Sequence, residues 1–301
     1  MVCYLFYLSG NRNSYHISGN EIMRKAYKDN PNLGLSFLYN TYLGRIILKP
    51  LVKNKKISSA MGRFMDSKLS RILIKRFVLK NKINLSDYEN KNYISFNDFF
   101  IRKIKKGKRK LNNDQDVFSS VCDSKLTVYK IDNKLTFKVK NSTYNISSVI
   151  KDSKLASEYK NGYVFIFRLS PNDYHRYYYN ANGKLLKKYR IHGFFNSVNP
   201  VSYGKFKVFK ENERECSILD TKEFDKIIYV EVGALLVGKI VNNDLDTFKR
   251  WDEKGYFMYG GSTVILIVKE NILKVDKDIL KNSLGGFETC VKLGEKIAKK
   301  L

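Results

Sequence analysis

The chain has 301 residues, enough for one large domain or two small ones. Its 43% hydrophobic and 14% aromatic content excludes an intrinsically disordered protein. Its 56 lysines and arginines stand against 29 aspartates and glutamates. The resulting net charge of +27 predicts attraction to a polyanion, either a nucleic acid or an anionic membrane surface.

Apolar residues recur at helical spacing in the first third of the chain. Leu35, Leu38, Tyr42 and Ile46 are three or four residues apart, which predicts a helix with one apolar face. The basic stretch LKPLVKNKKISSAMGRFMDSKLSRILIKR (residues 48–76) follows. Basic amphipathic helices suit a position on anionic lipid, but they suit equally a solvated layer packed on the rest of the protein.

A change from helices to strands is predicted near residue 115. Just before it, Ser95 followed by Asp98 predicts the start of one more helix. Beyond it lie the strand-like segments KLTVYKI, YVFIFRLS, KFKVFK, KIIYVEVGALLVGKIV and TVILIV, whereas the last ten residues, KLGEKIAKKL, are predicted to be helical. The sequence therefore predicts an α+β protein, with a helical region over residues 1–112 and a strand-rich, mixed-sheet or barrel-like core over residues 113–301.

The cysteines and the apolar runs limit the cellular setting. The four cysteines are far apart and form no Cys-x-x-Cys pair, which argues against a zinc site or a disulfide framework and favours a reducing compartment. No apolar run reaches the roughly 18 to 20 residues needed to cross a bilayer. Any membrane contact is therefore expected to be peripheral.

Three short segments carry residues capable of chemistry, and each also has an ordinary structural interpretation. His175 in RLSPNDYHRYYYN follows an apolar strand, where an imidazole can serve as a general acid or base or simply stabilise a turn. Asp123 in VCDSKLTVY precedes a strand, where an aspartate commonly caps its own turn. Ser262 follows Gly260 and Gly261, and a Gly-Gly pair is a common hairpin signal. None of the three is specific by itself.

Taken in order with their neighbours, these segments resemble the phosphatidylserine decarboxylase family, from about Tyr39 to Gly294. SFNDFFIRKIKKGKR is similar to the family's stretch ahead of the catalytic core, CDSK to its aspartate turn, and SPNDYHR to its aspartate-tyrosine-histidine-arginine segment. FFNSVNP, NEREC, VEVGALLVG and EKGYFMYGGST then follow in the family's order. The ordered set carries the resemblance, rather than any single tetrapeptide.

The resemblance implies a proenzyme that cleaves itself between Gly261 and Ser262, within the catalytic core. The products would be chains 1–261 and 262–301. Ser262 would attack the preceding carbonyl carbon, and the glycines would let the backbone reach the required geometry. β-Elimination and hydrolysis would turn Ser262 into a pyruvoyl group, the covalent cofactor, with no metal involved. Its ketone would form a Schiff base with phosphatidylserine and act as the electron sink while CO2 leaves, which gives phosphatidylethanolamine.

The family pattern also implies roles for other residues. Asp123 matches the aspartate of the self-cleavage relay, and His175 matches a histidine that could supply a proton in decarboxylation. Many members carry a second histidine three residues later, where this chain has Tyr178, and a phenol with a pKa near 10 is a poor general base. Either His175 assists both self-cleavage and decarboxylation, or another group such as His192 replaces the second histidine, or processing is slow or absent.

Partners and location follow from the same resemblance. Phosphatidylserine would be the substrate, an anionic membrane surface would hold the basic helices, and the cleaved chains would stay together, with a homodimer also suggested. The protein would then be peripheral, on the cytoplasmic side of the cell membrane. Two other hypotheses about function stay open. One is a non-processing lipid-binding relative, which Tyr178 favours, and the other is a basic nucleic-acid-binding protein. No RNA- or DNA-binding motif is present, so nucleic acid is not an expected partner.

Overall fold

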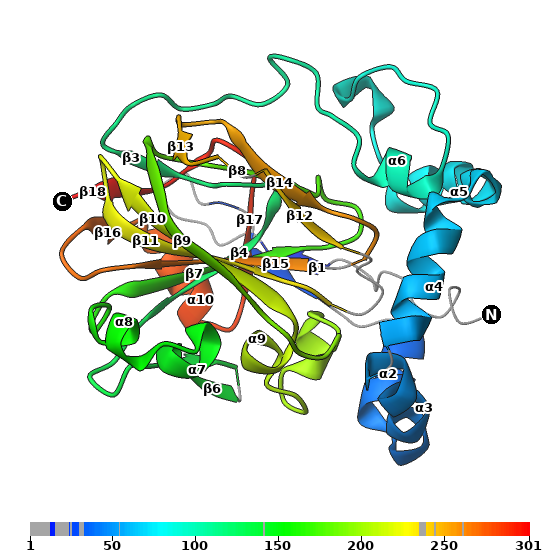
Figure 1. The fold of residues 1–301 in the computed structure, drawn as a ribbon, viewed down its shortest axis with the longest axis horizontal. Helices are drawn as coiled ribbons and strands as arrows, with labels where there is room; N and C mark the ends of the chain where they lie inside the picture. The colour runs from blue at the N-terminus through cyan, green and yellow to red at the C-terminus, as the bar shows by residue number, and fades with distance from the viewer. Residues whose placement is uncertain are drawn as a thin grey trace.

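A computed structural model of the chain describes residues 13–15, 24, 26–29, 33–53, 55–140, 142–234, 239–243, 245–260 and 262–301. The helices of the first third of the chain form a group on one side, and a sheet-rich core fills the rest (Figure 1). The predicted α+β class is therefore confirmed, and helices do precede the main run of strands.

The helical group consists of α2 (Leu33–Asn40), α3 (Tyr42–Lys53), α4 (Lys55–Asp66), α5 (Ile72–Asn81) and α6 (Phe96–Phe100). The predicted helix start at Ser95 is confirmed, because the Ser95 side chain accepts a hydrogen bond from the Asp98 N–H at 3.1 Å. Aromatic packing then joins α6 to α5, with the Phe77 and Phe96 rings 5.1 Å apart. Helices this short depend on such tertiary contacts rather than on propensity.

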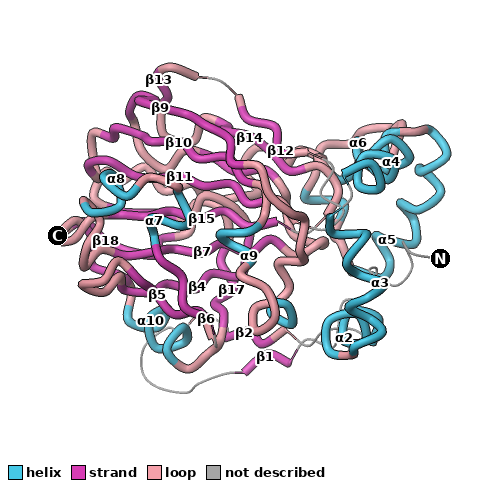
Figure 2. The backbone as a smooth tube through the Cα atoms, turned by 60° about the horizontal axis from the view of Figure 1, so that its bottom comes forward, coloured by secondary structure: helices cyan, strands magenta, loops and turns pink. Residues whose placement is uncertain are grey.

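The core is built on one ten-stranded sheet (Figure 2). Its order is β1 (Asn13–Tyr15), β2 (Ala26–Lys28), β17 (Glu288–Val291), β4 (Ser124–Lys130), β7 (Tyr163–Leu169), β15 (Ser262–Val268), β11 (Asp225–Val232), β10 (Arg214–Thr221), β9 (Gly183–Ile191) and β13 (Thr247–Phe248). Each neighbouring pair is antiparallel. Among the described strands, the sheet ends at β1 and β13 and does not close into a barrel.

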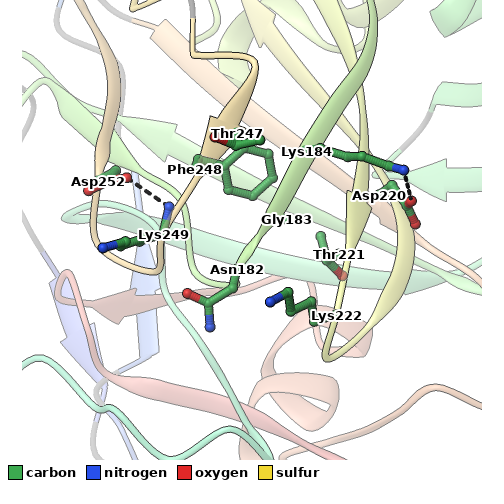
Figure 3. A pocket seen from close by; sticks show the side chains of 10 residues that line it. All are labelled: Asn182, Gly183, Lys184, Asp220, Thr221, Lys222, Thr247, Phe248, Lys249 and Asp252. Carbon is green, nitrogen blue, oxygen red and sulfur yellow. Dashed lines mark hydrogen bonds and ion pairs between the residues drawn. The ribbon is translucent and has the colours of Figure 1, made fainter.

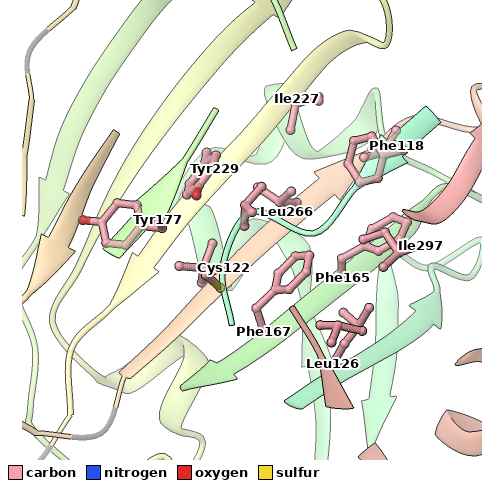
Figure 4. Close-up of a cluster of buried hydrophobic side chains, with 14 of the residues drawn as sticks. Phe118, Cys122, Leu126, Phe165, Phe167, Tyr177, Ile227, Tyr229, Leu266 and Ile297 are labelled. Atoms are coloured by element: carbon pink, nitrogen blue, oxygen red, sulfur yellow. The ribbon is translucent and has the colours of Figure 1, made fainter. Parts of the chain in front are cut away.

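Strand β15 lies in the middle of this sheet, and all seven of its residues are buried. On one face, Leu266 packs with Phe167 and Tyr229 in a cluster that we call the inner core (Figure 4). On the other face, Ile265 and Ile267 belong to a second cluster, the outer core. An apolar run without alternation is what a strand covered on both faces requires.

Smaller elements cover the two faces. Two three-stranded sheets close the inner core. One has the order β12 (Ile240–Asn242), β14 (Glu253–Phe257), β8 (Arg176–Tyr178), and the other has the order β16 (Leu273–Val275), β18 (Lys296–Lys300), β3 (Val117–Ser119). The outer core is closed by β5 (Thr136–Val139), β6 (Ser142–Asn145), α7 (Ile146–Ile150), α8 (Ser153–Ser157) and α9 (Val208–Glu211), while α10 (Lys277–Leu284) packs on β4 and β17. The helix predicted for the last ten residues is wrong, because Lys296–Lys300 form β18 between β16 and β3 and the residues before them form a turn.

Over the described ranges, no helix has both the length and the apolar character of a membrane span.

Candidate active site

Ser262 is the first residue of β15, directly opposite Leu169 of β7. Its side chain is 0% exposed, and its Oγ has no hydrogen-bond partner among the described atoms. Because side chains alternate along a strand, Ser262 shares a face with Val264 and Leu266 and points toward the inner core. Gly260, just upstream, has φ +137°, a conformation that favours glycine, whereas Gly261 lies outside the described residues.

His175 immediately precedes β8 and faces the same space. Its carbonyl oxygen accepts a hydrogen bond from the Phe257 N–H at 3.0 Å, so the ladder with β14 continues through it. Tyr177 and Tyr179 belong to the inner core, and alternation places the His175 side chain on their side of the strand. Ser262 and His175 therefore face one interlayer space from its two walls.

The hydrogen bonding of His175 assigns its tautomer. Nδ1 lies 3.0 Å from the backbone carbonyl oxygen of Asp173, and a carbonyl can only accept, so Nδ1 carries the proton. Nε2 then bears a free lone pair, and it is buried with no partner in the part of the chain that the structure describes. Complete burial lowers the pKa of His175 to about 3, although Asp173 opposes the shift. The imidazole is thus neutral at physiological pH and able to accept a hydrogen bond from a hydroxyl.

Asp123 lies just before β4 and is held by cations. Its carboxylate accepts hydrogen bonds from Arg109 Nε at 2.9 Å and Nη2 at 2.5 Å, from Lys292 Nζ at 3.2 Å and from the Leu293 N–H at 2.9 Å. Burial alone raises the pKa of Asp123, but Arg109 and Lys292 outweigh it and leave the pKa below its usual value. The hydrogen bonds described for Asp123 do not include His175 or Ser262, and its place in a proton relay stays a prediction.

The structure places Tyr178 and His192 away from Ser262. Tyr178 lies on the opposite face of β8 from His175, and its hydroxyl is 2.9 Å from that of Tyr174 and 3.4 Å from Glu253 Oε2. Burial raises the pKa of Tyr178 further above its ordinary value. The His192 side chain is 74% exposed, with Nδ1 3.7 Å from Glu213. Of the groups considered from sequence, His175 is the one on the face of Ser262.

A buried ion pair that sequence reasoning missed supports His175. Lys125 Nζ lies 2.6 and 2.5 Å from the two carboxylate oxygens of Asp173, and Asp173 also accepts from the Ser170 N–H at 2.7 Å. This pair ties the turn that presents His175 to strand β4. Asp173 stands in the DYHR segment, so the sequence contained a signal for it, but nothing in the sequence identified Lys125 as its partner.

A large open pocket lies elsewhere on the core. It has a volume of 730 Å³ and is lined by residues that include Asn182, Lys184, Thr221 and Phe248 (Figure 3). Thr221 pairs with Asp225 at one end of β11, whereas Thr263 pairs with Val232 at the other. Seven residue steps along a strand span about 23 Å, so this pocket is remote from Ser262.

The groups around Ser262 are a hydroxyl and a neutral imidazole nitrogen that face one interlayer space. A serine after glycine, with an unpartnered Oγ and a bare imidazole nitrogen on the same side, is the arrangement that intramolecular attack on a peptide needs. Over the described ranges, no three histidine, cysteine, aspartate or glutamate side chains come together as metal ligands.

Comparison with known proteins gives one consistent result. Residues 96–299 match the family model described as phosphatidylserine decarboxylase. The protein named phosphatidylserine decarboxylase proenzyme 2 of Clostridium acetobutylicum is 47% identical over 275 residues, 91% of this chain and 94% of that protein. Proteins named phosphatidylserine decarboxylase proenzyme from Ruminiclostridium cellulolyticum and Clostridium botulinum are 41% and 39% identical, over 87% and 88% of this chain and 90% and 92% of theirs.

Proposed function

The chain belongs to the phosphatidylserine decarboxylase family, and on that basis we propose that it removes CO2 from phosphatidylserine to give phosphatidylethanolamine. The relatives align over about nine-tenths of both chains, so the proposal concerns the whole protein rather than one segment. The observation that carries it is local: the unpartnered Oγ of Ser262 faces the same interlayer space as the unpartnered Nε2 of His175.

We propose that Ser262 first cleaves the chain. Its Oγ attacks the carbonyl carbon of Gly261 and gives its proton to Nε2 of His175, and the peptide C–N bond breaks to leave an ester. Loss of the Ser262 α-proton then breaks the C–O bond, with the Gly261 carboxylate as leaving group. Water converts the remaining dehydroalanine to a pyruvoyl group and ammonia. The first step needs an unprotonated imidazole, and burial keeps His175 in that form, although the same lowered pKa makes it a weaker base.

The surrounding residues suit the second reaction as well. A pyruvoyl group at position 262 supplies a ketone that condenses with the substrate amine and accepts the electron pair released with CO2. Strand β7 pairs with position 262 directly, and β11 pairs with the next residue, Thr263. The Phe100 ring lies 4.2 Å from the His175 ring and screens it from water. His175 is then the group placed to return a proton to the carbon that loses CO2.

The expected result for the purified protein is two chains, residues 1–261 and 262–301. Intact mass measurement under denaturing conditions checks the cut, and hydroxylamine should add to the ketone on the smaller chain. Phosphatidylserine presented in mixed micelles should release CO2. A protein that remains one 35.1 kDa species and releases no CO2 would contradict the proposal and leave the non-processing lipid-binding alternative.

The helical group is proposed to rest on an anionic membrane at the cytoplasmic side. The exposed apolar residues of this group and of the 3-10 helix Lys68–Arg71 between α4 and α5, each at least 40% accessible, are Leu33, Phe37, Tyr42, Leu43, Ile46, Ile47, Phe64, Leu69, Ile72 and Leu79. Interspersed with them are exposed basic residues: Lys49, Arg63, Lys68, Arg71 and Lys75. The helices stand to one side of the core (Figures 1 and 2), so they can contact a surface while the core remains in water.

Sedimentation with vesicles tests this membrane proposal. Replacing Leu43, Ile46 and Ile47 of α3 by serine should weaken partitioning onto vesicles that contain phosphatidylserine by at least about tenfold, because apolar area buried in the interface is lost. The matched control replaces three exposed leucines outside the helical group, Leu186, Leu284 and Leu301. Equal partitioning of the two triple variants would show that α3 does not bind the membrane.

A further inference from the structure

Arg102, just after α6, is buried without a counter-ion. The residue is 2% exposed, and no salt bridge to a carboxylate is found for it within the described residues. Its hydrogen bonds are long: 3.5 and 3.4 Å to the carbonyls of Phe99 and Phe100, 3.4 Å to the Tyr88 hydroxyl and 3.5 Å to the Asp173 carbonyl. Nε has no partner among the described atoms. A desolvated cation held this weakly is costly unless an anion joins it.

Other buried arginines of this chain are satisfied. Arg168 is paired with Glu288 at 2.5 Å and Arg176 with Glu253 at 2.6 Å. Arg214 has no carboxylate, but three of its nitrogens donate to backbone carbonyls at 2.6, 2.8 and 3.0 Å. Ordinary N–H···O distances are about 2.7–3.2 Å, so the distances at Arg102 mark it as the exception among them.

Two aromatic rings fix the Arg102 guanidinium in place. Its central carbon lies 4.3 Å from the centroid of the Tyr88 ring and 4.9 Å from that of Phe99. Cation–π contacts offset part of the desolvation of the charge, and they orient the planar group without occupying its N–H donors. Nε has no described partner, and the contacts of Nη1 and Nη2 are long, so an oxyanion that binds the guanidinium through two parallel hydrogen bonds would replace weak contacts by strong ones.

The position of Arg102 relates it to the candidate active site. The Asp173 carbonyl oxygen contacts both Arg102 Nη2, at 3.5 Å, and His175 Nδ1, at 3.0 Å. An anion bound by Arg102 would therefore lie beside His175. The segment just before the cleavage point packs on α6, the helix that precedes Arg102: the Tyr259 N–H donates to Asn97 Oδ1 at 2.9 Å, and the Tyr259 ring lies 5.5 Å from Phe100. A cut after Gly261 would release the end of that segment.

We propose that Arg102 binds the phosphodiester of the substrate head group beside His175 in the cleaved enzyme, an inference that rests on the proposed function. The substrate also carries a carboxylate, but that group loses its charge as CO2 departs. A guanidinium bound to it would stabilise the ground state more than the transition state and slow the reaction. The phosphodiester keeps its charge throughout, so binding it positions the substrate without opposing turnover.

The test uses two soluble probes and the processed protein. Glycerophosphoethanolamine has the phosphodiester but no carboxylate, and its Kd is measured by calorimetry. Glycerophosphoserine has both groups, and its KM is measured from CO2 release. In Arg102→Gln, both constants should rise by the same factor, about tenfold or more, because hydrogen bonds to a charged group are lost. Arg102→Lys keeps the positive charge but loses the paired N–H donors of the guanidinium. It should fold normally and show a smaller rise in both constants.

The controls separate this proposal from the proposed function. Lys103→Gln removes the same charge from the neighbouring exposed residue and should leave both constants unchanged. A rise in KM for glycerophosphoserine without a rise in Kd for glycerophosphoethanolamine would assign the carboxylate to Arg102 instead, and no change in either would overturn the proposal. If Arg102→Gln does not fold, Arg102→Lys decides by the same criteria. Failure of the wild-type protein to release CO2 would refute the proposed function, while the calorimetric comparison would still test Arg102.

Discussion

Replacement of Ser262 by alanine is expected to leave one uncut chain of 35.1 kDa and to abolish CO2 release from phosphatidylserine. The alanine methyl group has no lone pair to attack Gly261, so neither the ester nor the ketone can form. Intact mass and CO2 assays on the same preparation measure the two effects together. A Ser262→Ala protein that still decarboxylates would refute the assignment of the ketone to this residue.

The same substitution should not destabilise the protein. The Ser262 hydroxyl is buried with no described partner, and a buried polar group left in that condition costs about 1–3 kcal/mol. Its removal is expected to leave the free energy of unfolding equal or higher. Ser217 of β10 is the matched control, since its Oγ is also buried and unpartnered in the described structure. Ser217→Ala should cleave normally.

Replacement of His175 by glutamine is expected to slow both self-cleavage and turnover by at least about hundredfold, the usual contribution of a general acid or base. An amide fills much of the same space but cannot accept a proton from Ser262. The time course of chain cleavage after expression in vitro, and kcat of any processed material, measure the two steps. The control is His192→Gln, which alters an exposed residue and should change neither. Normal rates in the His175 variant would exclude it from both steps.

His175 should also leave a signature in the pH dependence of stability. Burial lowers its pKa from 6.5 to about 3, so between these values the unfolded chain binds a proton that the folded chain does not. The free energy of unfolding of the uncut chain should therefore fall as pH decreases through this window, by up to about 1.4 kcal/mol per unit from this group alone. In the Ser262→Ala background, where neither protein is cut, adding His175→Gln should give a gain in stability relative to Ser262→Ala as the pH is lowered from 7 to 4. An unchanged difference between the two proteins would show that the imidazole is not buried and neutral.

Local signals predicted some elements correctly and misled for others. The apolar run of β15 and the Ser95 cap follow from neighbouring residues, and both are confirmed. The segment KFKVFK alternates like a strand, but part of it forms α9, because Val208 and Phe209 are both buried there against the outer core. The terminal residues Lys296–Lys300 have good helix formers, yet pairing with β3 and β16 decides their conformation.

The sequence suggested candidate residues for the site, but it did not suggest their contacts. The order of motifs drew attention to Ser262, His175 and Asp123, and the topology then places the first two on one interlayer space. The partners of Asp123, in contrast, are 14 and 169 residues away along the chain. Contacts at such separations depend on strand order, which one sequence does not specify. Arg102 could not be identified from the sequence for the same reason. What distinguishes it is the lack of a described counter-ion, and that depends on contacts made only in the folded chain.

The position of β15 in the sheet has a consequence for how the protein could refold before and after the cut. Ser262 begins a strand whose two neighbours, β7 and β11, both come from earlier in the chain, as do β4 beside β17 and β3 beside β18. The uncut chain finds this arrangement by a unimolecular search, whereas separated pieces could regain it only by encountering each other, at a rate set by their concentration. A cut before Ser262 would therefore convert a protein that can refold alone into one whose native state, once lost, is not readily recovered, and its lifetime would depend on how slowly it unfolds.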